Sequence, residues 1–295
     1  MSRTDIPKAD WIAVDCGADA LHVWAMQGTA AVAQAHSDTV CRASPNGRFI
    51  AELSALIGAW EVDSHTPIIA CGLTAPACRP VPCTPLDTRL HSVPDAPLSI
   101  QVIAGLKQPS PADVMCGEET RIAGFLALNP GWDGVICLPG PHSKWAQVSA
   151  GEVVSFQTYI SGELFALLAG HSVLRPSVQT DGFDTNAFAD AISDILSRPE
   201  RLAAQLFAIH AANLLNGAAP QTARARLSGL LIGAELAAAR PYWLGQNIAL
   251  IGDAAQAALY ARALETQGVP ATLADAPRMT LAGLTAAYRL LKAAP

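Results

Sequence analysis

Three short apolar runs separated by glycine turns open this chain and restrict its fold more than any other feature. The runs are Trp11 to Val14, Leu21 to Met26 and Ala30 to Ala35, with Gly17 and Gly28 in the breaks. Short runs that end in glycine are typical of β-strands joined by tight turns. We therefore predict a three-stranded β-meander at the start of the chain.

A helix and a buried strand follow the predicted meander. Phe49, Leu53, Leu56 and Trp60 recur at the spacing of one helix face. The next apolar run, at 68–71, lies between a proline and a glycine, which is typical of a short strand buried on both faces.

The middle of the first half is rich in proline. Seven prolines between Pro67 and Pro97 exclude a long helix there. A further strand is predicted at 99–104, and the segment 107–113 is interpreted as a linker. Because 295 residues suggest about two domains, we expect an N-terminal domain over 1–108 and a C-terminal domain over 109–295.

Strands alternate with helices in the second half, which predicts an α/β fold. We predict helices at 118–128, 163–174 and 227–239, strands at 134–138 and 248–251, and a hairpin through 145–148 and 153–159. Ser197 and Glu200 have the spacing of a capping box for one further helix. The last helix, at 279–292, is amphipathic and is expected to pack back on the first domain.

The composition excludes several classes of protein. Apolar residues make up 51% of the chain and charged residues only 15%, unlike a disordered sequence. With 25 acidic and 19 basic residues, a formal charge of −6 and no basic run, we expect neither nucleic acid nor membrane as a partner. Residues 1–10 lack the apolar core of a signal peptide, and no stretch predicts a membrane span.

The cysteines indicate a reducing compartment. Seven cysteines without a CxxC pair fit free thiols in a cytoplasmic protein better than a disulfide framework. Cys71, Cys78 and Cys83 are close in sequence, but their spacing matches no familiar zinc ligand set, so zinc is the less favoured interpretation.

Asp15 directly follows the first apolar run, and Gly17 lies two residues after Asp15. An acid in this place can hold a hydrated Mg²⁺ beside phosphate oxygens. Turns also select aspartate and glycine for their backbone conformations alone. The motif alone does not distinguish a phosphate-binding site from an acid selected only for a hairpin turn.

A second polar loop follows the apolar run at 135–138. It contains Gly140, His142, Ser143 and Lys144, and these residue types suit an anion through backbone amides, a hydroxyl and positive charge. The spacing is not that of a Walker loop. An ordinary hairpin turn that carries polar residues explains this loop equally well.

A third candidate lies at a predicted helix start. Glu118 and Glu119 fall in its first turn, where the helix dipole favours acids, so capping explains both residues without chemistry. The functional alternative is a general base aimed at a substrate hydroxyl.

Four sequence blocks, taken in order, point to a known family. They are MCGEET at 115–120, similar to M-R-G-E-E-T; PGPHSKW at 139–145, similar to P-G-T-H-S-K-W; SGELFALL with HS at 161–172, similar to T-G-E-L followed by H-S; and LSGLLIGAE at 227–235. Through these blocks the chain resembles the 2-dehydro-3-deoxygalactonokinase family, within the superfamily of actin-like ATPases and sugar kinases. The resemblance covers nearly the whole chain.

The resemblance implies a fold and a reaction. The fold would be α/β, with two actin-like (ribonuclease H-like) domains, each a mixed sheet flanked by helices, and an interdomain cleft. The reaction would transfer the γ-phosphate of ATP to the 6-hydroxyl of 2-dehydro-3-deoxy-D-galactonate with Mg²⁺. The partners would be ATP and the sugar acid, and a homodimer is compatible with the resemblance.

The resemblance also implies roles for individual residues. The first phosphate loop would contain Asp15, which would hold Mg²⁺ through water, and Gly17. The second would contain Gly140, His142, Ser143 and Lys144. Gly252 and Asp253 would border the adenosine, and His22, Thr74 and Glu163 would contact the sugar acid. By analogy with related sugar kinases, Glu118 would be the general base, with Glu119 as the next choice.

The chain departs from the family pattern in its first loop and near the predicted base. Asp19 adds an acid, His22 stands where arginine is usual, Cys116 replaces another arginine, and Pro141 replaces a threonine. Lost donors of this kind can each cost about 10²–10³-fold in rate. Two alternatives therefore stay open: a relative that binds nucleotide or sugar acid with weak or no turnover, and a kinase for a different sugar acid.

Overall fold

The computed structural model describes residues 8–17, 20–38, 47–60, 62–73, 78–94 and 96–293. The chain divides into two compact units, which we describe one at a time. Unit 1 contains Met1–Trp132, Ser149–Ser155 and Ala276–Pro295, and unit 2 contains Asp133–Val148 and Phe156–Asp275. The division after Trp132 lies later in the chain than the predicted boundary at residue 108.

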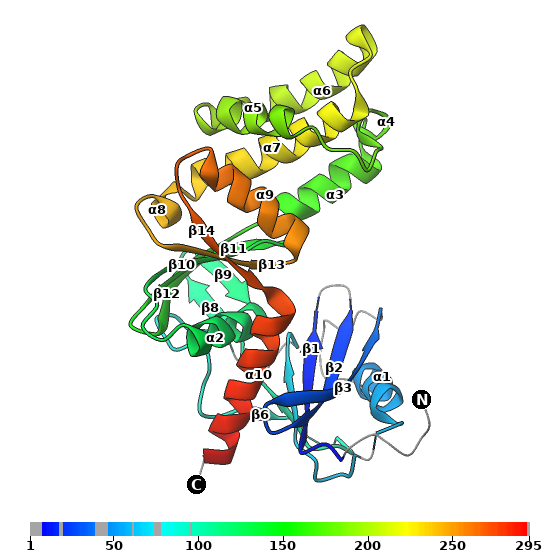
Figure 1. Cartoon of the computed structure of the whole chain (residues 1–295), viewed down its shortest axis with the longest axis vertical. Coiled ribbons are helices and arrows are strands. Elements are labelled where there is room, and N and C mark those ends of the chain that lie inside the picture. The colour runs from blue at the N-terminus through cyan, green and yellow to red at the C-terminus, as the bar shows by residue number, and fades with distance from the viewer. Residues whose placement is uncertain are drawn as a thin grey trace. The chain divides into compact units, whose positions relative to one another are not determined.

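A six-stranded mixed sheet forms the body of unit 1 (Figure 1). Its strands, in spatial order, are β3 (Ala30–Ser37), β2 (Leu21–Gln27), β1 (Trp11–Cys16), β4 (Ile68–Cys71), β7 (Ile100–Val102) and β6 (His91–Ser92). Strands β1, β2 and β3 pair antiparallel, which confirms the predicted meander, and β4 runs parallel to both β1 and β7.

Each face of this sheet is covered by one helix. Side chains alternate along a strand, so Ile12 and Val14 of β1 face one core while Trp11 faces the other. Helix α1 (Gly47–Ile57) buries its apolar side in the first core. Helix α10 (Ala276–Ala293) buries Tyr288 in the second, where its ring stacks on Trp11 with centroids 4.5 Å apart.

The segment 107–113 is not a linker. Strands β8 (Leu106–Pro109) and β9 (Ala112–Met115) form an antiparallel hairpin beside β5 (Arg79–Pro80). Leu106 and Met115 lie opposite each other in this hairpin, and both side chains are buried. The linker prediction was wrong because the two strands are short and carry exposed residues, such as Lys107 and Pro109, beside buried ones.

Helix α2 (Glu118–Leu128) belongs to unit 1 because it packs against α10 in backbone contact. A Cβ on Gly124 would lie 1.9 Å from the Met279 carbonyl oxygen, and a Cβ on Gly283 would lie 1.9 Å from that of Thr120. Only glycine permits this approach. The close contact explains why the division of the chain falls beyond α2.

Unit 2 is built on a five-stranded sheet with helices around it (Figure 1). The strands, in spatial order, are β12 (Glu152–Tyr159), β11 (Ser143–Ser149), β10 (Gly134–Leu138), β13 (Ile248–Gly252) and β14 (Ala271–Asp275). The helices are α3 (Ser161–His171), α4 (Arg175–Val178), α5 (Thr185–Leu196), α6 (Leu202–Asn216), α7 (Pro220–Ala238), α8 (Arg240–Trp243) and α9 (Ala254–Glu265), with a 3₁₀ turn at Pro199–Arg201.

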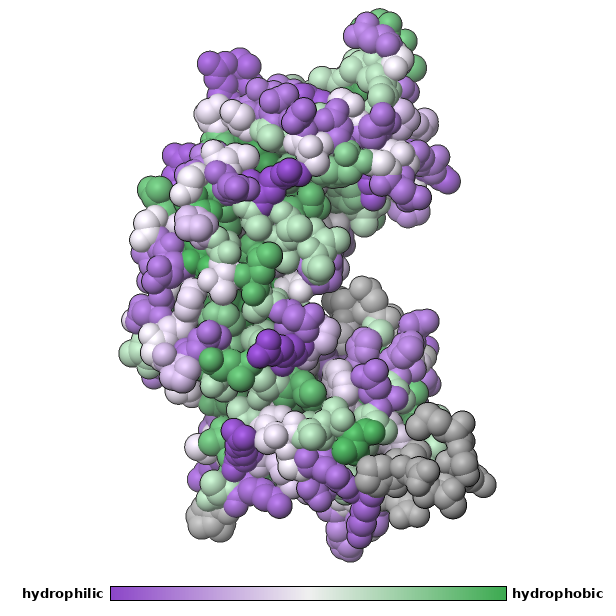
Figure 2. Space-filling view, in the orientation of Figure 1, coloured by the Kyte–Doolittle hydropathy of each residue, from purple (hydrophilic) through white to green (hydrophobic). Residues whose placement is uncertain are grey.

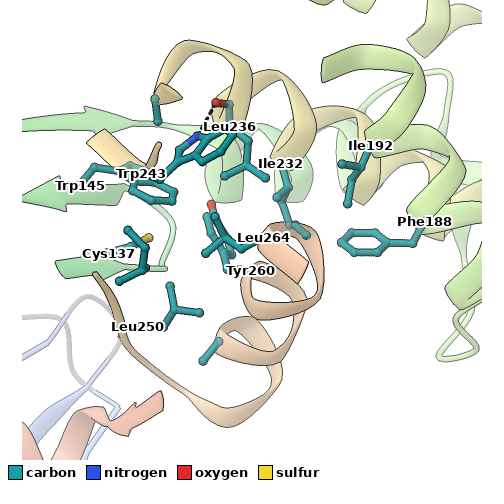
Figure 3. Packing of buried hydrophobic residues seen from close by; sticks show 14 of the residues in the cluster. Cys137, Trp145, Phe188, Ile192, Ile232, Leu236, Trp243, Leu250, Tyr260 and Leu264 are labelled. Carbon is teal, nitrogen blue, oxygen red and sulfur yellow. Dashed lines mark hydrogen bonds between the residues drawn. The ribbon is translucent and has the colours of Figure 1, made fainter. Parts of the chain in front are cut away.

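The core of unit 2 joins the sheet to α5, α7 and α9. Figure 3 shows Trp145, Trp243 and Tyr260 packed with aliphatic residues of these elements. Figure 2 shows hydrophilic residues over much of the helical end of this unit, with hydrophobic residues between them. In the part of the chain that the structure describes, no helix combines the length and apolar character that a membrane crossing requires.

The predicted capping box is absent. Ser197 ends α5 instead, and its hydroxyl donates to the carbonyls of Ser193 and Asp194. The 3₁₀ turn that begins at Pro199 has no side-chain cap. The box pattern failed because Ser197 bonds back to the preceding helix rather than forward.

Candidate active site

Asp15 is a buried carboxylate at the end of β1. Its side chain accepts a hydrogen bond from the Cys71 thiol at 3.5 Å, and its other oxygen lies 3.5 Å from Nη2 of Arg121. Asp15 is only 7% exposed. The structure therefore rules out an ordinary surface hairpin acid at this position.

Three segments of unit 1 meet at glycines near the end of β1. Gly72 follows β4 with φ +77°, and a Cβ there would lie 2.2 Å from the Cys16 carbonyl oxygen. Gly117 precedes α2 with φ +104°, and its Cβ would lie 3.1 Å from Cα of Gly72. Glycine is needed at both places for its backbone conformation and its lack of a side chain. This contact holds the start of α2 beside the end of β1.

The two predicted acids of α2 differ in environment. Glu118 is half-buried and accepts a hydrogen bond from the Cys116 amide at 2.9 Å. Glu119 is fully buried and accepts from the Gly117 amide at 2.7 Å and from the Thr120 hydroxyl at 3.0 Å. Burial, together with the negative charge of Glu118, raises the pKa of Glu119 to about 8. Glu119 therefore carries a proton at neutral pH.

Arg121 was missed by the sequence reasoning. It lies one turn after Glu118, donates from Nε to the Thr280 hydroxyl at 3.3 Å, and pairs with Asp15. Burial opposes its charge, but the carboxylates of Asp15 and Glu118 outweigh burial and raise the pKa of Arg121. A cation three residues after an acid on a predicted helix was the available signal.

Gly17 and His22 are the other predicted site residues of unit 1 that the structure describes. Gly17 directly follows β1, and His22 lies opposite Asp15 in the β1–β2 register. His22 is exposed, and its ring stacks with those of Trp24 and His36 at centroid distances of 6.0 and 5.9 Å. Thr74 and Asp19 lie outside the described residues.

The polar loop after β10 packs directly on the start of α3. A Cβ on Gly162 would lie 2.3 Å from the Gly140 carbonyl oxygen, and the Glu163 amide donates to the Pro141 carbonyl at 3.0 Å. Nε2 of His142 lies 2.6 Å from a carboxylate oxygen of Glu163, and both side chains are solvent-accessible. The structure thus brings Gly140, His142 and Glu163 together.

Ser143 and Lys144 engage other groups of the protein. They are neighbours on β11 and point to opposite faces of the sheet. The buried Ser143 hydroxyl donates to Glu235 at 2.8 Å, and Nζ of the buried Lys144 donates to the Thr158 hydroxyl at 2.8 Å. Their assignment to a phosphate loop stays a prediction.

Glu235 of α7 collects hydrogen bonds from several elements. Besides Ser143, it accepts from Nε1 of Trp145 at 2.8 Å and from the Tyr260 hydroxyl at 2.9 Å. Glu235 is 3% exposed, and burial raises its pKa. Sequence reasoning passed over this residue, although an acid within the apolar block LSGLLIGAE was a visible signal.

Gly252 and Asp253 lie at the end of β13. Asp253 caps α9 by accepting from the amides of Ala255 and Gln256 at 2.9 and 3.0 Å. A Cβ on Gly252 would lie 3.5 Å from Pro139, at the start of the polar loop. The capping role of Asp253 is established, whereas its contact with a nucleotide stays a prediction.

A cavity of about 270 Å³ opens within unit 2 next to the polar loop. Its wall consists of Gly140, Ser161, Gly162, Phe165, Phe183, Arg224, Ser228, Leu231, Ile232, Gln256, Leu259 and Tyr260. The Arg224 guanidinium lies over the Phe165 ring, 5.0 Å from its centroid. Apolar and aromatic walls with a few polar groups are typical of a small-molecule site.

The acidic side chains in the described part of the chain suit a metal ion that needs few protein ligands. No group of three or more His, Cys, Asp or Glu side chains there could enclose a metal ion. Mg²⁺ usually keeps several waters and binds one or two carboxylates together with substrate phosphates. The Asp15 carboxylate could supply such an oxygen ligand, so these residues fit a hydrated Mg²⁺.

The sequence matches the family described as 2-keto-3-deoxy-galactonokinase over residues 15–287. The chain belongs to this family. It is 32% identical to a provisionally named 2-dehydro-3-deoxygalactonokinase of Rhizobium meliloti strain 1021, over 95% of this chain and 97% of the relative. It is 31% identical to 2-dehydro-3-deoxygalactonokinase of Escherichia coli K12, over 90% of this chain and 92% of the relative.

Solved structures share the fold of this chain. A crystal structure from Sinorhizobium meliloti, provisionally assigned as a 2-dehydro-3-deoxygalactonokinase, has a TM-score of 0.87 at 31% identity and covers 96% of this chain and 100% of its own. The Clostridium difficile activator of 2-hydroxyisocaproyl-CoA dehydratase, solved with ADPNP, has a TM-score of 0.52 at 13% identity over 96% of this chain and 94% of its own. The fold is α/β, with mixed sheets flanked by helices, as the sequence predicted.

Proposed function

We propose that this chain transfers the γ-phosphoryl group of ATP to the 6-hydroxyl of 2-dehydro-3-deoxy-D-galactonate. The observation that carries the proposal is the family match over residues 15–287, which includes the polar groups of both units. The names of the curated relatives from Rhizobium meliloti and Escherichia coli support the same substrate.

The cavity of unit 2 is the proposed adenosine site. Phe165, Ile232 and Leu259 offer apolar surface to a purine, and Ser228 and Gln256 offer hydrogen bonds. Gly140 and Gly162 also line the cavity, and Gly162 belongs to the first turn of α3. Because the start of a helix favours anions, we place the phosphate groups of ATP beside this turn.

Asp15 is the proposed ligand of the Mg²⁺ hydration shell. When bound, Mg²⁺ would neutralise charge on the phosphate oxygens. Arg121 balances the charge of Asp15 within unit 1 and keeps this buried carboxylate in place. Phosphoryl transfer requires mainly positioning and charge stabilisation, which these side chains can supply.

Glu118 is the proposed general base. The 6-hydroxyl oxygen forms a bond to the γ-phosphorus, the bond from that phosphorus to the bridging oxygen of ADP breaks, and the hydroxyl proton passes to a carboxylate. Glu119 is protonated at neutral pH and has no exposed surface, so it cannot accept this proton. Glu118 is partly exposed in the same turn, which favours it.

A substrate panel tests the proposal. Purified protein, ATP and Mg²⁺ are mixed with 2-dehydro-3-deoxy-D-galactonate and with other sugar acids, and ADP release is followed. We expect turnover on the named acid above all others. Preferred turnover on another acid would replace the substrate assignment, and nucleotide binding without turnover on any acid would replace the kinase by a binding module.

A further inference from the structure

Glu235 joins four elements at the wall of the unit 2 cavity. Its carboxylate accepts from Ser143 and Trp145 of β11 and from Tyr260 of α9, and the hydroxyl of Ser161, at the start of α3, bonds to it as well. A carboxylate has two oxygens with about four acceptor positions, so four donors satisfy it fully.

Two of these donors are themselves part of the cavity wall. Ser161 and Tyr260 line the cavity, whereas Ser143 and Trp145 do not. Trp145 and Tyr260 also pack in the apolar core drawn in Figure 3. The carboxylate therefore connects the rigid core of unit 2 to two groups that face the space where a ligand would bind.

Glu235 also ends a row of cavity residues on its own helix. Arg224, Ser228, Leu231 and Ile232 of α7 line the cavity, and Glu235 follows them at helical spacing on the same face. Three of its hydrogen bonds come from side chains of β11 and α9, so the protein itself holds the carboxylate in place.

We propose that Glu235 is a positioning residue that sets the shape of the nucleotide cavity by fixing Ser161 and Tyr260 against the β11 strand. The proposal rests on the nucleotide site proposed above. It assigns Glu235 no contact with ATP and no part in the chemical step, so loss of its carboxylate acts on nucleotide affinity first.

Glu235→Gln is the direct test, because glutamine keeps the size of the side chain but has one acceptor oxygen and adds two donors. At least two of the four donors then lose their acceptor. We expect the Kd for ADP, measured by calorimetry, and the KM for ATP to rise about tenfold or more, with the KM for the sugar acid changed less than twofold.

Trp243→Phe is the matched control. Nε1 of Trp243 donates to the Leu236 carbonyl at 2.7 Å in the same core (Figure 3), and Trp243 does not line the cavity. The control loses one buried hydrogen bond and some Tm, yet we expect its Kd for ADP to stay within twofold of the wild-type value. An equal loss of affinity in both variants would overturn the proposal, as would unchanged binding by Glu235→Gln.

Smaller changes keep the test decisive if Glu235→Gln does not fold. Tyr260→Phe and Ser161→Ala each remove one hydroxyl and leave the carboxylate in place. We expect each to raise the Kd for ADP about threefold or more, and wild-type affinity in both would overturn the proposal. If the wild-type chain binds no ADP, the nucleotide site itself is wrong; normal wild-type binding with unaffected variants refutes the role of Glu235 alone.

Discussion

At the scale of single residues, the site depends on how burial changes the charge of each acid. Glu118 and Glu119 are adjacent in sequence, yet only Glu119 is fully buried. The sequence placed both in the first turn of a helix and could not separate them, since exposure depends on how α2 packs in unit 1. Packing thus separates the two acids, because it buries Glu119 and leaves Glu118 partly exposed.

The two acids should respond differently to substitution. We expect Glu118→Gln to lower kcat by about 10²–10⁴-fold with Tm nearly unchanged. Glu119→Gln replaces an acid that is already neutral at pH 7, so its kcat should fall much less. Steady-state kinetics and thermal unfolding of both variants check this, and wild-type turnover by Glu118→Gln would remove the base assignment.

Glu119 should also give the protein a measurable pH dependence. Its pKa of about 8 in the folded state exceeds the usual 4.5, so between these values the folded chain holds a proton that the unfolded chain has released. The free energy of unfolding should therefore decrease as pH rises through this window. Urea unfolding from pH 5 to 8.5 should show a flatter dependence for Glu119→Gln than for wild type; identical slopes would contradict the assigned pKa.

The ion pair between Arg121 and Asp15 should matter more for stability than a surface pair. Arg121→Gln leaves Asp15 buried without its cation, and we expect a loss of about 1–3 kcal/mol in the free energy of unfolding. Arg226→Gln is the control, because the pair of Arg226 with Asp194 is more exposed and should be worth less than about 1 kcal/mol. Equal losses in the two variants would contradict this account.

At the scale of elements, the start of α3 holds the polar loop after β10. Gly162→Ala would place a methyl group 2.3 Å from the Gly140 carbonyl oxygen and displace the loop, so we expect the KM for ATP to rise about tenfold. Gly170→Ala lies in the same helix with open space around it and should raise stability by about 0.5–1 kcal/mol. Nucleotide kinetics of the two alanine variants give the comparison, and equal KM values would argue against loop contact.

The local pattern of the chain predicted its elements better than their contacts. The meander β1–β3 was predictable because glycine turns divide three apolar runs. The local pattern does not reveal strand β14, and it predicts a linker at 107–113, because short strands with exposed residues resemble loops in sequence. The bonds of Ser143 and Tyr260 to Glu235 join residues far apart in the chain, so no local pattern could reveal them.

At the scale of the whole molecule, the order of four sequence blocks was more informative than the composition. A net charge of −6 says little about a small ligand, because each unit places polar groups at strand ends where a few local contacts could hold a phosphate or a metal ion. Because the family match covers residues 15–287, it includes these polar groups of both units, and we propose that they serve one reaction.

The most direct measurement of that reaction is the structure of its product. Purified protein is incubated with ATP, Mg²⁺ and 2-dehydro-3-deoxy-D-galactonate, and the product is analysed by ³¹P and ¹H NMR beside the Glu118→Gln variant. We expect ADP and the sugar acid phosphorylated at its 6-hydroxyl in equal amounts, formed by the wild-type chain and at least about a hundredfold more slowly by the variant. A phosphate on another hydroxyl, or ADP formed without a phosphorylated sugar acid, would contradict the proposed function.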